Sequence, residues 1–316
     1  MPETSTGAVI AIDRGAFGEV VGSDARIEKI AGGFGFVEGP TWTDDGGGYL
    51  LFSDIPNNRI HRWSADHGVS VFREPSGHTN GNTRDRGGQL LSCEHSGRRV
   101  AIEDRAGVRV TVIDHFLGNR LNSPNDVVVR SDGTIWFTDP PYGLPSDGSG
   151  RELDRNHVFR FDPRDGSLTS VADDFEGPNG LCFSPDERRL YVADSSGRTH
   201  IRVFDVDSHG RLHGGHVFCT ISTGVPDGIR CDVDGRLWSS AGDGVHVFST
   251  DGQMIGKIVT PSAPSRRDPT VNAPESVANL CFGGGGASVA RLYMTACTSL
   301  YAIDVLVSGA TQGRTG

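Results

Sequence analysis

Methionine, paired cysteines and long apolar runs are scarce in this sequence of 316 residues, and each scarcity narrows the choice of fold. Only 3 residues are Met, whereas 44 are Gly, which favours many short strands and tight turns over long helices. No apolar run approaches the ~20 residues that a membrane helix needs. The first residues lack a basic start followed by an apolar core, so no secretory signal is predicted.

The six cysteines form no CxxC pair and fall mostly within strand-like runs. We interpret them as reduced, buried thiols and predict a cytoplasmic protein. The net charge of -10 and the lack of a basic stripe argue against nucleic acid as a partner, because phosphate contacts need clustered Lys and Arg. We therefore expect a small-molecule partner, with neither nucleic acid nor membrane; the sequence does not predict the oligomeric state.

Short apolar runs repeat six times along the chain, and this internal repetition decides the fold class. Each run follows a turn rich in Gly, Asp or Asn, residues that supply the positive φ of hairpin turns. A third alternating run follows in every copy, and a fourth follows in five of the six. The six aligned runs read YLLFSD, QLLSCEH, TIWFTD, RLYVAD, RLWSSAGD and RLYMTAC.

The strand count predicts an all-β fold, a six-bladed β-propeller with four-stranded blades. The sixth copy ends at its third strand, while the run ARIEKIAG at 25–32 precedes the first copy and is left over. This N-terminal strand is expected to close the ring, because an unclosed last blade would leave an open edge. A sandwich or two tandem barrels would not predict such a deficit and surplus. The predicted organisation is a partly ordered extension over 1–24, one propeller domain over 25–307 and a flexible tail over 308–316.

A polar residue opens the first strand of successive copies, at the position that faces the central tunnel of a propeller. These residues are Glu38, Asn80, Asn125, Asn179 and Asp227. Asn-Gly and Asp-Gly are also common turn dipeptides, but five such residues in register favour a shared purpose. The sixth copy is ambiguous, with Glu275, Ser276 and Asn279 as candidates.

All of these tunnel-facing side chains offer oxygen, and two of them are carboxylates. Carboxylates brought together repel each other unless a cation lies between them. Oxygen donors favour Ca²⁺ or Mg²⁺ over zinc. We predict Ca²⁺, whose charge the two carboxylates balance, with Zn²⁺, Mn²⁺ or Mg²⁺ as substitutes.

The mouth of the tunnel is expected to collect further groups, since the starts of the first strands and the ends of the second strands share one face. The longest loop inside a blade, 140–156, is interpreted as a lid that contributes Tyr142 to substrate binding. His95 is a weaker candidate for a catalytic base, because lone histidines usually pack or solvate. No GxSxG or HExxH motif occurs, which removes the usual signals of serine hydrolases and zinc proteases.

With these residues the chain resembles the gluconolactonase / senescence marker protein (regucalcin) family, six-bladed calcium-dependent lactonases. The likeness is closest to the bacterial gluconolactonase and drug-responsive lactonase branch. The matching segments extend from about residue 36 to 302 and include EGPTW, RLNSPNDVVVRSDGTIWFTDPPYG, PNGLCFSPDERRLYVAD and PDGIRCDVDGRLW.

The resemblance implies that Glu38, Asn179 and Asp227 bind the catalytic calcium, and that Asp227 is also the general base. It implies that Asn125 lies at the metal and contacts substrate or completes the coordination. Asn80, its neighbour in the ring, is assigned to substrate binding.

One position departs from the animal members of the family, in which an arginine two residues before the equivalent of Asn125 contacts the sugar acid. This chain has Ser123 there, and Arg120 is the nearby candidate to replace the arginine in substrate binding. The departure puts a preference for sugar lactones in doubt.

The predicted function is calcium-dependent hydrolysis of a lactone, with a metal-polarised carbonyl and a water activated by a carboxylate. More distant relatives of the same architecture include paraoxonases and diisopropyl fluorophosphatase, so hydrolysis of phosphotriesters is one alternative. A ligand-binding propeller without catalysis is the other, since many propellers are scaffolds.

Overall fold

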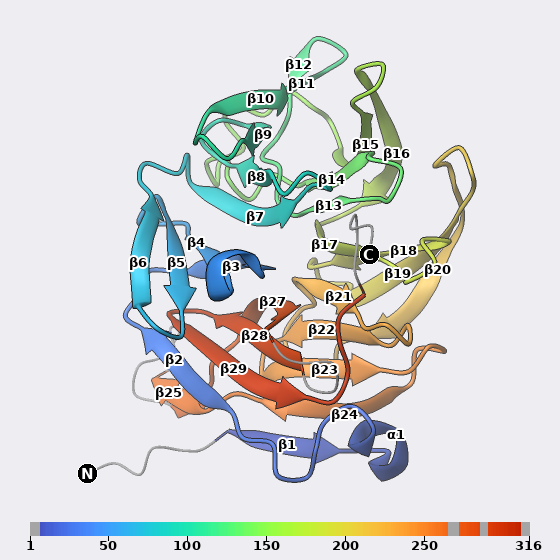
Figure 1. Cartoon of the computed structure of the whole chain (residues 1–316). Coiled ribbons are helices and arrows are strands. Elements are labelled where there is room, and N and C mark those ends of the chain that lie inside the picture. Colours follow the sequence, from blue (N-terminus) through green and yellow to red (C-terminus); the bar gives the residue numbers. More distant parts are fainter. Residues whose placement is uncertain (1–6, 265–271, 285–289, 311–316) are drawn as a thin grey trace.

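The computed structural model describes residues 7–264, 272–284 and 290–310. Six antiparallel sheets are arranged as blades around a central axis (Figure 1). The prediction of an all-β, six-bladed propeller with four-stranded blades is thereby confirmed. In this described part, no helix is long and apolar enough to cross a membrane.

Blades 1 to 3 each use four consecutive strands, ordered from the axis to the rim. Blade 1 contains β3 (Val37–Thr43), β4 (Tyr49–Asp54), β5 (Arg59–Ser64) and β6 (Gly68–Arg73), with a short 3-10 turn, η1 (Asp45–Gly47). Blade 2 contains β7 (Thr79–Arg84), β8 (Leu90–Glu94), β9 (Arg99–Glu103) and β10 (Arg109–Ile113). Blade 3 contains β13 (Val127–Val129), β14 (Ile135–Asp139), β15 (Asn156–Asp162) and β16 (Ser167–Phe175), preceded by the hairpin β11 (His115–Phe116) and β12 (Asn119–Arg120).

Blades 4 to 6 repeat this arrangement. Blade 4 contains β17 (Pro178–Phe183), β18 (Arg189–Asp194), β19 (His200–Val206) and β20 (Leu212–Thr220). Blade 5 contains β21 (Ile229–Cys231), β22 (Leu237–Ala241), β23 (Gly244–Phe248) and β24 (Met254–Val259), followed by the hairpin β25 (Ser262–Pro264) and β26 (Asn272–Pro274). Blade 6 contains β27 (Val277–Gly283), β28 (Ala290–Ala296) and β29 (Ser299–Val305).

The missing strand of blade 6 comes from the other end of the chain. Strand β2 (Glu28–Gly32) pairs antiparallel with β29, so blue and red ribbons lie side by side in Figure 1. This is the ring closure predicted from the leftover run at 25–32. Strand β2 thus supplies the fourth, outermost strand of blade 6, so that β29 does not end the blade as an open edge.

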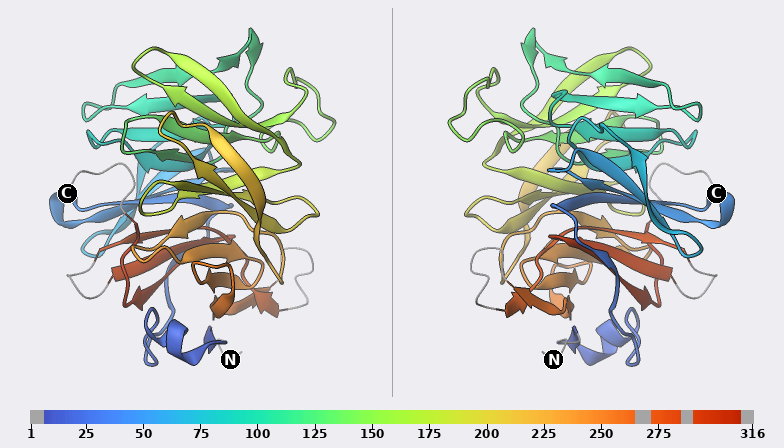
Figure 2. Two further views of the ribbon diagram at one scale, coloured as in Figure 1. Left: turned by 90° about the vertical axis from the view of Figure 1, so that its right-hand side faces the viewer. Right: turned by 90° about the vertical axis from the view of Figure 1, so that its left-hand side faces the viewer.

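The segment before β2, predicted as a partly ordered extension over 1–24, adds two elements to blade 5. Strand β1 (Ala8–Ala11) pairs with β24 as a fifth strand, and helix α1 (Arg14–Gly18) follows it at the rim (Figure 2). The carboxylate of Asp13 caps the helix by accepting the N–H groups of Gly15 and Ala16, and Phe17 is buried against the backbone of Gly256. At the other end, Ala310 N donates to Cys231 O at 2.9 Å; the rest of the predicted tail, 311–316, lies outside the described residues.

Blade stacking explains why the inner strands are buried on both faces. All five residues of β8 and of β14 are buried, because each blade packs between two neighbours. The largest fully buried side chains include Trp136 and Trp238, in the second strands of blades 3 and 5. This packing fixes the inner strands, and with them the residues that face the axis.

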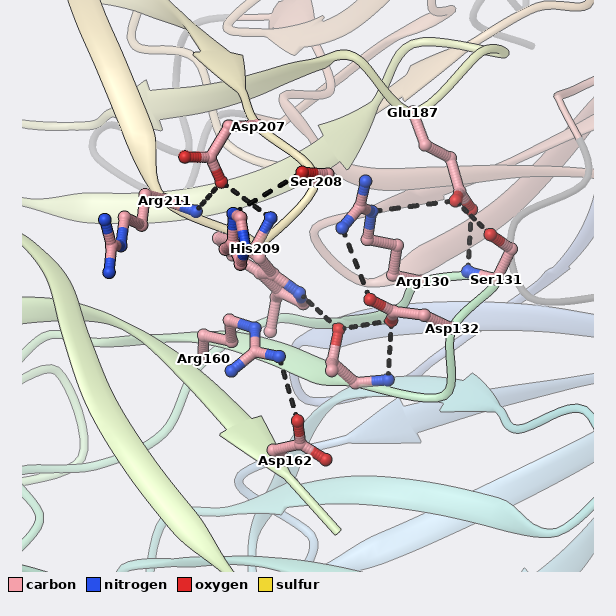
Figure 3. A network of polar contacts seen from close by, with 12 residues as sticks. Arg130, Ser131, Asp132, Arg160, Asp162, Glu187, Asp207, Ser208, His209 and Arg211 are labelled. Carbon is pink, nitrogen blue, oxygen red and sulfur yellow. Dashed lines mark hydrogen bonds and ion pairs between the residues drawn. The ribbon is translucent and has the colours of Figure 1, made fainter. Parts of the chain in front are cut away.

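The face on which the first strands begin is called the upper mouth here, and the opposite one the lower face. Turns at the lower face form a polar network of their own (Figure 3). Ser131 N donates to Glu187 Oε1 at 2.8 Å and so joins the turns of blades 3 and 4. Arg130 lies 3.7 Å from Glu187 and 3.3 Å from Asp132, while Asp207 accepts two N–H groups of its own turn. Arg130, Glu187 and Asp207 therefore have local partners.

Candidate active site

The five polar residues predicted to face the axis converge on one cavity at the upper mouth. Each stands at or just before the start of the first strand of its blade, so that blades 1 to 5 contribute one residue each. The cavity has a volume of about 370 Å³. Its lining comprises Phe36, Glu38, Ile55, Asn80, His95, Asn125, Tyr142, Asn179, Ser195 and Asp227.

The glycines that follow three of these residues serve close packing of neighbouring strands. Gly81, Gly180 and Gly228 do not have positive φ, so they are not turn glycines. A Cβ atom on Gly81 would lie 2.5 Å from Asn125 O, and one on Gly180 would lie 2.1 Å from Asp227 O. The N–H groups of these two glycines donate to the same carbonyls, at 2.8 and 3.1 Å. At these three positions a Cβ atom would collide with the neighbouring blade. The Asn-Gly and Asp-Gly pairs therefore mark close contacts between blades and not turns.

Three amides form a directed chain across blades 2, 3 and 4. Asn80 Nδ2 donates to Asn125 Oδ1, and Asn125 Nδ2 donates to Asn179 Oδ1, both at 2.6 Å. A hydrogen bond from the Asn179 side chain reaches Asp227 and lowers the pKa of that carboxyl group. The chain links the three amides to one another and ends at the Asp227 carboxyl group.

Glu38 and Asp227 are the two carboxyl groups of the cavity, and burial dominates both. Burial raises the pKa of Glu38 to about 7, although hydrogen bonds from Gly39 and Asn279 act in the opposite direction. Burial, followed by the nearby charge of Glu38, raises the pKa of Asp227 well above its ordinary value. The charge of Glu38 thus opposes ionisation of Asp227, and a cation between the two carboxylates would favour their charged forms.

Blade 6 presents an alanine where the other blades present a polar side chain. Gly228 N donates to Ala278 O at 2.7 Å, the same backbone contact that Gly81 and Gly180 make with their ring residues. None of the three candidates therefore occupies the ring. Glu275 accepts from Tyr301 Oη at 2.5 Å, whereas Asn279 follows the ring position and donates to Glu38 at 2.9 Å.

The loop over residues 140–156, predicted as a lid, is anchored by Ser123. Ser123 is fully buried; its Oγ donates to Pro140 O at 2.6 Å and accepts from Gly143 N at 2.9 Å. A Cβ atom on Gly143 would lie 2.6 Å from His95, so the loop packs directly on the cavity wall. These contacts carry Tyr142 over the cavity, with its hydroxyl hydrogen-bonded to Ser195 and Asn179.

Arg120 and His95 were also named from the sequence, and only His95 lines the cavity. The guanidinium of Arg120 donates to Gly97 O at 2.9 Å and does not line the cavity, so the structure does not bring it together with the predicted site. His95 does line the cavity, 3.5 Å from Asn80 Nδ2. Burial lowers the pKa of His95 to about 4, so it is a neutral imidazole at physiological pH.

The donor set fits a hard divalent cation. In the described ranges, no group of three or more His, Cys, Asp or Glu side chains is arranged to hold a metal. The cavity instead combines two carboxylates with amide oxygens, the ligands that Ca²⁺ accepts in a flexible geometry. Glu38, Asn179 and Asp227 are the residues that could hold it, with Asn125 adjacent.

Comparisons with known proteins agree with this architecture. Residues 36–298 match the family described as the SMP-30/Gluconolactonase/LRE-like region. The chain is 34% identical over 288 residues to a gluconolactonase of Zymomonas mobilis, covering 83% of this chain and 77% of that protein. It is 28% identical over 268 residues to a pentonolactonase of Haloferax volcanii, covering 82% and 80%.

A solved structure gives the same result in three dimensions. The structure of a gluconolactonase from Xanthomonas campestris matches with a TM-score of 0.84 and 35% identity, over 96% of each chain. The similarity in fold and in sequence thus extends along nearly the whole length of both chains. This chain belongs to the SMP-30/gluconolactonase/LRE-like family.

Proposed function

We propose that the protein is a calcium-dependent lactonase that holds its cation with Glu38, Asn179 and Asp227. One observation carries this proposal: the buried Glu38 carboxylate, the half-buried Asp227 carboxylate and a chain of amides share a cavity whose described lining contains no Lys or Arg. The lactonase part is supported by the relatives, among them a gluconolactonase and a pentonolactonase. The choice of Ca²⁺ follows from the oxygen donors and from their two negative charges.

The protein's own groups have separate tasks in ester cleavage. When bound, Ca²⁺ would supply polarisation of the lactone carbonyl and stabilisation of the developing oxyanion. Asp227 accepts a proton from the attacking water, an effect worth typically ~10²–10⁴-fold in rate. Asn80 and Asn125 orient the lactone, with Asn125 lying next to the cation or among its ligands.

Tyr142 contributes a hydrogen-bond donor from the lid loop. Partial burial and the charge of Asp227 raise the pKa of its phenol, so the hydroxyl keeps its proton at all relevant pH values. The phenol spans from blade 3 to the edge of blade 4, beside Gly177. It therefore limits the width of the cavity and can donate to an oxygen of the substrate.

We propose a hydroxylated sugar lactone as the substrate class, on the basis of these neutral polar groups and of the two named relatives. Ser123 does not argue against it, because that residue anchors the lid and leaves recognition to Tyr142, Asn80 and His95.

A panel of glucono-1,5-lactone, a γ-lactone and a fluorophosphate, each with and without Ca²⁺, tests the proposal. After dialysis against EGTA, hydrolysis of the glucono-lactone should fall to the uncatalysed rate and return when Ca²⁺ is added. Undiminished hydrolysis in EGTA would contradict calcium dependence. A preference for the fluorophosphate would favour the phosphotriesterase alternative, and no turnover of any compound would favour a binding protein.

A further inference from the structure

Glu38 is held by an asymmetric set of hydrogen bonds. Gly39 N donates to Glu38 Oε2 at 2.7 Å, and Asn279 Nδ2 donates to the same oxygen at 2.9 Å. No hydrogen bond that the structure shows in the described residues reaches Oε1. One carboxylate oxygen is thus tied to the protein, while the other is left for the cavity.

The orientation of the Asn279 amide is determined by its other contact. Leu280 N donates to Asn279 Oδ1 at 2.8 Å. Because a backbone N–H can only donate, the oxygen of the amide must face it, and the NH₂ group must face Glu38. The side chain is buried, and Thr295 Oγ1 donates to its main-chain carbonyl at 3.1 Å, so the backbone below it is fixed as well.

Room for this amide depends on the glycine after Asp227. A Cβ atom on Gly228 would lie 2.1 Å from both Cγ and Oδ1 of Asn279. Of the six positions that follow the ring, four are glycine, and only Asp126 and Asn279 carry a side chain. Asp126 pairs with Arg230 at 3.4 Å, whereas Asn279 contacts a ring carboxylate directly.

From this geometry we infer that Asn279 is a positioning residue for the cation: it ties Glu38 Oε2 so that Oε1 points into the cavity. This inference rests on the proposed function, because it assumes that Glu38 binds Ca²⁺. Groups that orient metal ligands in this way typically contribute 10–100-fold to metal affinity. Asn279 is not among the residues that line the cavity and donates to Glu38, so its proposed effect on the cation passes through Glu38.

The test is the affinity for Ca²⁺, measured by isothermal titration calorimetry on the full chain for the wild type, Asn279→Ala and a control, Asn82→Ala. Asn82 is a buried amide in the first strand of blade 2 that donates to Gly39 O, Ser53 Oγ and Asn80 O but to no carboxylate. We expect the Kd to rise about 10- to 100-fold in Asn279→Ala and to stay within about 3-fold in Asn82→Ala, while the Ca²⁺-free Tm falls in both. Asn279→Ser, whose hydroxyl is too short to reach Glu38, serves if the alanine variant does not fold and should show the same loss of affinity.

An unchanged Kd in the Asn279 variants, or an equal rise in Asn82→Ala, would overturn the inference while leaving the proposed function in place. A wild-type protein that binds no Ca²⁺ would instead contradict the proposed function itself, and the positioning role with it. The wild-type titration therefore separates the two failures.

Discussion

The cavity at the upper mouth and the turns at the lower face of this propeller treat charge in opposite ways. At the lower face, Arg130 and Glu187 are near each other and Asp207 accepts the N–H groups of its own turn, so each charge has a local partner. In the cavity at the upper mouth, burial raises the pKa of both Glu38 and Asp227, and the charge of Glu38 raises the pKa of Asp227 further. The fold thus pairs the charges of its lower turns but leaves two carboxyl groups with raised pKa values in the cavity. Perturbed pKa values of this kind are typical of functional sites and agree with the proposed cation site.

The largest effect should come from the carboxylate assigned as the base. Asp227→Asn removes the proton acceptor but keeps an oxygen, so kcat should fall by ~10²–10⁴-fold while Ca²⁺ still binds; Asp227→Ala should weaken Ca²⁺ binding as well. Steady-state kinetics with titration of Ca²⁺ check both. Asp243→Asn is the matched control, because Asp243 belongs to the same blade and pairs with His246 and Lys257 outside the cavity. Equal losses in the two Asn variants would argue against a base at Asp227.

Acidity should weaken Ca²⁺ binding at the upper mouth. Because the folded pKa of Glu38 is raised from 4.5 to about 7, the stability linked to its protonated form is present below its unfolded pKa. That stability is lost as pH rises through 7. Calcium requires the ionised carboxylates, so its affinity should rise with pH, by up to about tenfold per unit for each proton released.

The measurement is the rise in Tm caused by a fixed Ca²⁺ concentration between pH 5.5 and 7.5, since ligand stabilisation follows the ratio of concentration to Kd. Burial also raises the pKa of Asp139 to about 7, but that group lies outside the cavity lining. Its titration should therefore shift the Tm equally with and without Ca²⁺. A Ca²⁺-induced rise that is constant over this range would contradict the prediction.

Loss of the lid hydroxyl should have a moderate effect that separates substrate binding from cation binding. Tyr142→Phe removes one donor, so KM should rise by about 2- to 13-fold, the equivalent of one hydrogen bond, with the Kd for Ca²⁺ unchanged. Tyr49→Phe is the control, because its hydroxyl accepts from Arg84 away from the cavity. A KM equal to that of the wild type would remove Tyr142 from substrate recognition.

The smallest effect is expected at the lower face. Glu187→Gln weakens the contacts with Arg130 and Ser131 but keeps an acceptor oxygen for Ser131 N, so it should lower the free energy of unfolding by only ~1 kcal/mol. Neither kcat nor KM should change. Chemical denaturation and steady-state assays of the same preparation measure the two quantities, and a drop in kcat would show that the faces are coupled.

The blade count and the closing strand were predictable from the sequence, because every blade repeats one pattern of alternation and turns. The rim additions were not predictable in the same way. The cap at Asp13 is local, but strand β1 pairs with β24 and Phe17 packs against Gly256, contacts that join residues far apart in the chain. A short apolar run near the start carries no repeat to identify its partner.

The ring in blades 1 to 5 was also predictable, yet the signal at blade 6 was missed. The segments PNGLCF and VANLCF align on Leu-Cys-Phe, which places Ala278 opposite Asn179 and Asn279 opposite Gly180. An amide in a position otherwise held by glycine is the signal that could have identified the contact with Glu38. Arg120 was proposed for its proximity in sequence to Ser123, but the direction of its side chain depends on the turn at Gly97, which lies in the preceding blade.

The pairing of β2 with β29 has a consequence for synthesis on the ribosome. A nascent chain makes β2 early, but this strand has to wait unpaired until Ser299–Val305 emerges. The oxygen atoms of the cavity come from five blades, so none of the growing intermediates can gather them all. Dissolved calcium should consequently be unable to guide early folding, and late long-range joining of the two chain regions should limit the rate of maturation.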